Sequence, residues 1–141
     1  MTDLASVSLN IAAGDSVKFE LYGDIFNNTG GNRTYEVAIV IGSKTVVVQG
    51  SAVIATANIV AVQMVGFAVV RSTSVLRLFV QARLNPATPD GTSVTDITRL
   101  TWSFSTSDFT GPQTCKIQIR ATAAGVTNTI TCGTSITHLK P

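Results

Sequence analysis

Apolar and polar residues alternate with a period of two in several separate runs of this chain. In the first run, Val17, Phe19 and Leu21 alternate with Lys18 and Glu20. Because successive side chains of a β-strand point to opposite faces, this pattern predicts a strand with one buried face. Four later runs repeat it, and their apolar members are Tyr35, Val37, Ile39 and Ile41; Leu76, Leu78, Val80, Ala82 and Leu84; Leu100, Trp102 and Phe104; and Cys115, Ile117, Ile119 and Ala121.

The most apolar region, residues 45–71, also predicts strands. It is rich in Val and Ile but is interrupted by polar residues and glycine, among them Gln49, Gln63 and Gly66. A membrane-spanning helix needs about 20 nearly uninterrupted apolar residues. We therefore expect consecutive strands in this region.

Turn-forming residues separate these runs. Asn, Gly and Pro gather at residues 27–32, 41–43, 85–91, 111–112 and 124–125, and a last strand with Ile130 and Cys132 follows. We find no segment that combines a sustained 3.6-residue period with helix caps. The chain is therefore predicted to be all-β with little or no helix. About eight or nine short strands predict one antiparallel, jelly-roll-like β-sandwich over residues 1–141, with an immunoglobulin-like topology as the main alternative.

The charge content suggests that part of the surface is covered by other subunits. Only 13% of the residues are charged, against the roughly 25% typical of soluble domains. The mean hydropathy is positive, at +0.34. Large exposed apolar patches generally mark interfaces, so we expect contacts between copies of the chain. A monomer coated with Thr, Ser and Asn is the alternative. Residues 1–6 are expected to be a flexible N-terminal segment and residues 137–141 a C-terminal tail.

The residues that most enzymes need for catalysis are sparse. His138 is the only histidine, and it lies three residues from the C-terminus. A catalytic base must be held rigidly by a third group, which a terminal tail does poorly, so we expect His138 to be a surface or interface residue. The chain has no four-ligand zinc spacing and no Gly-rich phosphate loop followed by Lys-Ser/Thr. We therefore predict a non-enzymatic protein without cofactor or metal.

The two cysteines lie on the apolar faces of two consecutive predicted strands. If these strands form a hairpin centred near Ala124, antiparallel pairing places Cys115 opposite roughly residue 133 and so close to Cys132. This predicts a cross-strand cysteine pair. In a reducing cytosol the two thiols would be small buried apolar groups, and a disulfide is the alternative.

The basic residues are scattered, and the chain has no run of Lys or Arg that would form a nucleic-acid-binding arm. Arg71, Arg77 and Arg83 have even spacing and would share a face if their strands were continuous. We expect them to make salt links between subunits, and a basic stripe for nucleic acid is the alternative. Because the N-terminus lacks the basic and apolar parts of a secretory signal, we expect synthesis in the cytoplasm.

Several segments resemble small β-sandwich virion proteins of tailed bacteriophages. They are residues 14–23 (GDSVKFELYG), residues 26–34 (FNNTGGNRT), a strand that leads to Ile41–Gly42, and residues 128–132 (NTITC). In that group the same module serves as a capsid decoration (cement) protein, a head-fibre module or a tail-fibre tip, often as a homotrimer. These motifs carry no catalytic residues, so the resemblance implies a structural role.

From this resemblance we expect a capsid decoration protein that stabilises a phage head as a homotrimer and lies on the capsid surface of the virion. Its partners would be copies of itself and the major capsid protein, with no nucleic acid and no membrane. The segment with Thr2, Asp3 and Leu4 is the candidate for ordering on the shell. A fibre tip that recognises host surface carbohydrate is the alternative. A coat protein that encloses a genome is a third hypothesis, which the missing basic arm disfavours.

Overall fold

The computed structural model describes residues 2–28, 30–54, 57, 59–72, 75–86, 96–105, 111–121 and 129–141. These residues form nine β-strands and no helix. The predicted turns at 87–91 and 124–125 lie outside the described residues. The strands are β1 (Thr2–Asn10), β2 (Ser16–Phe26), β3 (Arg33–Ile41), β4 (Lys44–Ile54), β5 (Ile59–Ser72), β6 (Val75–Pro86), β7 (Asp96–Ser105), β8 (Pro112–Ala121) and β9 (Thr129–Leu139).

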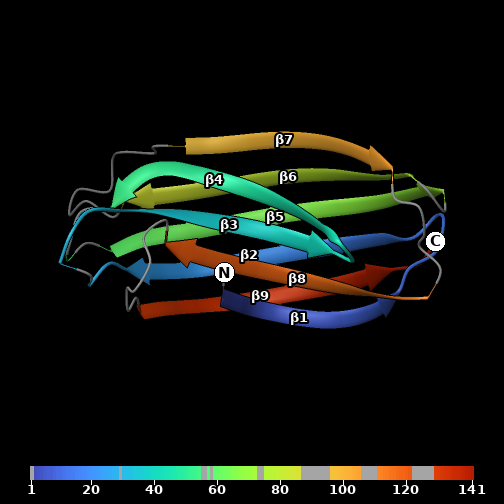
Figure 1. Cartoon of the computed structure of the whole chain (residues 1–141), viewed down its shortest axis with the longest axis horizontal. Helices are drawn as coiled ribbons and strands as arrows, with labels where there is room; N and C mark the ends of the chain where they lie inside the picture. Colours follow the sequence, from blue (N-terminus) through green and yellow to red (C-terminus); the bar gives the residue numbers. More distant parts are fainter. Residues whose placement is uncertain are drawn as a thin grey trace.

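The strands form two antiparallel sheets that pack face to face (Figure 1). The four-stranded sheet has the order β1-β8-β3-β4, and the five-stranded sheet has the order β7-β6-β5-β2-β9. The predicted all-β sandwich is therefore confirmed. Consecutive strands stay in one sheet in the β3–β4 hairpin and the β5–β6–β7 meander. The chain changes sheet between the other consecutive strands, which gives the sandwich its jelly-roll-like character.

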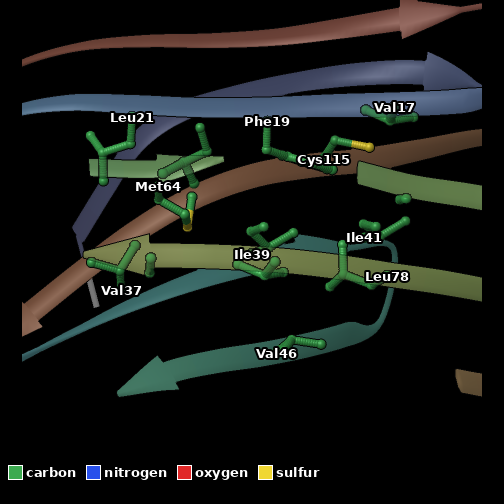
Figure 2. Packing of buried hydrophobic residues seen from close by; sticks show 14 of the residues in the cluster. Val17, Phe19, Leu21, Val37, Ile39, Ile41, Val46, Met64, Leu78 and Cys115 are labelled. Carbon is green, nitrogen blue, oxygen red and sulfur yellow. The ribbon is translucent and has the colours of Figure 1, made fainter. Parts of the chain in front are cut away.

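The inner faces of the two sheets form one hydrophobic cluster (Figure 2). Val17, Phe19 and Leu21 of β2 are fully buried and share this cluster with Ile39 of β3 and Leu78 of β6. Gly66 of β5 packs closely against the other sheet, since a Cβ atom there would lie 2.6 Å from Ile39 Cδ1. The alternating apolar faces predicted for β2, β3, β6 and β8 are thus the core wherever their side chains are described.

Strands lie close to both ends of the chain, which corrects two predictions. Residues 2–6, expected to be a flexible segment, belong to β1, which pairs with β8 from Thr2 opposite Ile119 to Asn10 opposite Pro112. Alternate side chains of β1, including Val7, pack against the core, and this packing holds the strand in place. Residues 137–139, expected to start a tail, complete β9. None of the described residues forms a helix long and apolar enough to cross a membrane.

Candidate interaction surface

The exposed large apolar side chains of the described residues all lie on one side of the molecule. They project from the outer face of the five-stranded sheet and are between 38% and 48% exposed. We call this surface the aromatic face, and its members are Tyr22, Ile59, Phe67, Phe79 and Leu139.

Strand alternation explains why these side chains point outward. The core takes Leu21 from β2, Ala68 from β5 and Leu78 from β6, and each is fully buried. Their neighbours in sequence must point to the other side of the pleated sheet. Tyr22, Phe67 and Phe79 are therefore directed away from the core by the same pattern that builds it.

Two phenylalanines form the centre of the aromatic face. Phe67 of β5 and Phe79 of β6 are directly opposite each other in the register of these strands. Lys18 of β2 is opposite Phe67 on the other side, and its Nζ lies 5.9 Å from the centroid of the Phe67 ring. Cross-strand neighbours of this kind interact directly, so Lys18, Phe67 and Phe79 form one continuous row across three strands.

A small polar network borders this row. Lys18 Nζ lies 2.8 Å from Glu20 Oε1, and Ser135 Oγ donates a hydrogen bond of 3.2 Å to Glu20 Oε2. The ion pair with Lys18 is the main cause that lowers the pKa of Glu20, and the same contact raises the pKa of Lys18. Two of the charges beside the aromatic row, Lys18 and Glu20, are thus paired with each other.

The predicted arginine stripe lies in part on the same face. Arg71 and Arg77 are exposed and belong to the outward-pointing rows of β5 and β6. The side chain of Arg83 lies outside the described residues. Phe79 lies two residues from Arg77 in the same outward row of β6. The β5–β6 register adds Phe67, which neither composition nor spacing could place there.

The outer face of the four-stranded sheet has a different character. At its centre, Ala38 is fully buried and Val40 is 9% exposed, although both point away from the core. Their register neighbours Gln118 and Lys116 have longer side chains that flank these positions. This sheet therefore covers its own outward-facing apolar residues.

The predicted shell-binding segment belongs to this polar side. Asp3 accepts hydrogen bonds from Lys116 Nζ at 2.8 Å and from Gln118 Nε2 at 2.6 Å, and these contacts lower its pKa. Leu4 packs against the core and Thr2 is exposed. Thr2, Asp3 and Leu4 are thus already ordered within the subunit, whereas we expected them to become ordered only on a shell.

The predicted cysteine pair is wrong in its geometry. Cys115 lies in β8 of the four-stranded sheet, opposite Val7 and Ile41, and Cys132 lies in β9 of the five-stranded sheet, opposite Gly23. Both cysteines are free. The prediction assumed a β8–β9 hairpin, but the chain changes sheet between these strands. Burial raises the pKa of Cys115 to about 11 and also raises that of Cys132.

His138 is held more firmly than the sequence suggested. It lies in β9, opposite Val17, and its Nε2 donates a hydrogen bond of 2.7 Å to Oδ2 of Asp15, which is 4% exposed. The same Asp15 oxygen accepts the backbone N–H of Ala12 at 3.0 Å. The hydrogen bond from Ala12 is the main cause that lowers the pKa of Asp15, and the hydrogen bond from His138 is the second cause.

This pair joins the end of β9 to the turn that precedes β2. The aspartate and the histidine are 123 positions apart in sequence, so only the β2–β9 register could reveal their contact.

Within the described part of the chain, no three or more His, Cys, Asp or Glu residues gather in a group that could hold a metal ion. Comparisons of the chain with protein-family models, curated proteins and solved structures gave no match.

Proposed function

We propose that this protein is a non-enzymatic structural component of a phage virion, a capsid decoration protein that binds the head as a homotrimer. The observation that carries the proposal is the segregation of exposed apolar side chains onto the aromatic face. The resemblance of residues 14–23, 26–34 and 128–132 to phage virion proteins supports the virion role. The protein would be made in the host cytoplasm and would end on the capsid surface.

The chemistry of the aromatic face suits association. Covering apolar surface is worth roughly 25 cal/mol per Å², and aromatic side chains are enriched at the centres of interfaces. Phe67 and Phe79 are directly opposite each other on two paired strands, so their backbone is already ordered before a partner arrives. Little backbone entropy is therefore lost when they are covered.

A cement protein can bind the shell tightly through weak contacts, because many copies bind together. In a trimer, three subunits engage the shell together, so the effective affinity exceeds that of one subunit by orders of magnitude. The aromatic face would contact neighbouring copies, while the polar face of the four-stranded sheet would remain in solvent.

A receptor-binding fibre tip is the second candidate, and one observation favours it. Tyr22 is 46% exposed beside Gln63, its register partner in β5, and an aromatic ring next to polar groups can stack on a sugar. In this case the aromatic face would bind host surface carbohydrate instead of another subunit.

Co-sedimentation tests the proposal. The purified protein is mixed separately with capsids of a related phage that lack their decoration protein and with host cell envelopes, and the pellets are assayed. A decoration protein would pellet with capsids, and the Phe67→Thr/Phe79→Thr variant would pellet much less. The Ser6→Ala variant, altered on the outer row of β1, serves as the matched control and would behave like the wild type.

The two candidate functions predict different pellets. Binding to envelopes that free sugars abolish would favour the fibre tip. A wild-type protein that binds neither capsids nor envelopes and stays monomeric at high concentration would contradict both candidates.

A further inference from the structure

Among the edge strands whose side chains are fully or largely described, β9 has the fewest features that would prevent a further strand from pairing with it. β9 is the terminal strand of the five-stranded sheet, and among the described strands only β2 pairs with it. The pairing is unbroken over eleven residues, from Phe26 opposite Thr129 to Ser16 opposite Leu139. Alternate backbone N–H and C=O groups of a terminal strand point away from the sheet.

Edge strands usually carry features that prevent a further strand from pairing with them. Charged side chains, proline and β-bulges are the common ones. The terminal strand β1 has two of these features, because Asp3 is charged and the register shifts between Asp3 and Ala5. β9 has a regular register, and residues 129–137 (TITCGTSIT) contain neither a charged residue nor proline.

We propose that β9 pairs antiparallel with β9 of a second copy of this chain, so that two five-stranded sheets become one continuous ten-stranded sheet. A two-fold axis near Thr134 or Ser135 gives the longest overlap of the two strands. The aromatic faces of both copies then lie on the same side of the joined sheet and stay open, so the pairing does not depend on the proposed virion role.

The distribution of charge and exposed apolar surface fits a second copy as the occupant. With the axis at Thr134, antiparallel pairing places Thr137, whose neighbour in β2 is Lys18, opposite Thr131 of the other copy, whose neighbour in β2 is the exposed Asp24. Opposite charges on the outer face thus flank the joint on both sides of the axis. The Leu139 side chain, 42% exposed in the single subunit, would be covered by the neighbouring strand.

Sedimentation equilibrium at low salt tests this pairing. In the Thr131→Lys/Thr137→Lys variant, lysines of the two copies lie directly opposite or diagonal to each other for either axis, which opposes pairing. Both threonines are exposed, so the subunit should fold. The mass should fall by a factor of about two relative to the wild type, as expected for loss of a two-fold contact. The control Ser43→Lys/Thr45→Lys adds the same charge at exposed positions near the β4 edge and should keep the wild-type mass.

Amide hydrogen exchange of the wild type gives a measurement that needs no variant. Exchange in residues 129–139 should become slower as the protein concentration rises, while exchange in β1 should not change. An unchanged mass in the β9 variant together with concentration-independent exchange in β9 would overturn the pairing.

The Phe67→Thr/Phe79→Thr variant separates this inference from the proposed function. If the mass falls in this variant but not in the β9 variant, the copies associate through the aromatic face and the β9 pairing is wrong. If the β9 variant alone changes the mass, the pairing stands and the association role of the aromatic face fails.

Discussion

The two sheets of this sandwich share one core but differ in how far the apolar residues on their outer faces are exposed. On the four-stranded sheet, Ala38 and Val40 point outward and are nevertheless buried. On the five-stranded sheet, Phe67 and Phe79 point outward and are 38% and 42% exposed. Side chains of the same subunit cover the apolar residues of the first face, whereas the second face leaves large aromatic rings in solvent.

This difference indicates where the chain is adapted to contact other molecules. A sheet that needed only to fold could carry Thr or Lys in place of the two phenylalanines, because their outward positions contribute nothing to the core. The exposed large apolar side chains of the described residues are therefore not spread evenly over the surface. They lie on one face, which is the face that we propose to be covered.

The largest expected effect comes from placing the same charge on each face. Ala38→Asp should lower the free energy of unfolding by about 3 kcal/mol, because the carboxylate would lose most of its hydration at a fully buried position. Phe79→Asp, at an exposed position, should cost less than about 1 kcal/mol. Urea unfolding of the dilute, dissociated proteins measures both. Equal losses of unfolding free energy in the two variants would contradict the difference between the two faces.

A smaller effect is expected at the aspartates on the two sheets. Asp15→Ala should lower the free energy of unfolding by about 1–3 kcal/mol, because buried Asp15 accepts bonds from Ala12 and His138. Asp3→Ala, on the exposed four-stranded face, should cost less. Urea unfolding at neutral pH gives both values, and a larger loss for Asp3→Ala would contradict this ranking.

The same aspartate predicts how stability depends on pH. The folded state lowers the pKa of Asp15 below its ordinary value of 3.8. Its contribution is therefore fully present above that ordinary pKa and is lost as pH falls through the lowered, folded-state pKa. Unfolding measured between about pH 2 and pH 6 should show a shallower acid dependence in Asp15→Ala than in the wild type. Parallel curves for the two proteins would show that Asp15 is not responsible.

The smallest effect on the fold is expected from the lysines of the two partly exposed ion pairs. Lys116→Ala removes the contact with Asp3 on the four-stranded face and should leave association unchanged. Lys18→Ala removes the cation beside Phe67 and should weaken association at low salt. Sedimentation velocity over a concentration series compares the two variants. Weaker association of Lys116→Ala would show that contacts involve the four-stranded face.

The sequence predicts the core strands well because alternation and burial have the same physical cause. Leu76, Leu78 and Val80 alternate over a long run, and all three are buried. β1 was missed because its inward residues, among them Ala5 and Val7, are smaller and separated by Ser, so that the pattern is weak.

The sequence could not predict contacts that depend on how strands are ordered. Cys115 and Cys132 were placed together by assuming a hairpin, whereas the chain changes sheet between them. The pairing of Phe67 with Phe79 follows from the β5–β6 register, and the contact of Asp15 with His138 joins the two ends of the chain. Alternation gives the face of a residue, but neighbours across strands come from topology.

Hydroxyl-radical footprinting of the wild type across a range of concentrations tests most directly whether the aromatic face is covered. We predict that oxidation of Phe67 and Phe79 falls as the protein associates, while oxidation of Val47, which is opposite Ala38 on the outer face of the four-stranded sheet, stays constant. Phenylalanines that remain equally reactive at every concentration, or protection confined to the four-stranded face, would contradict the account.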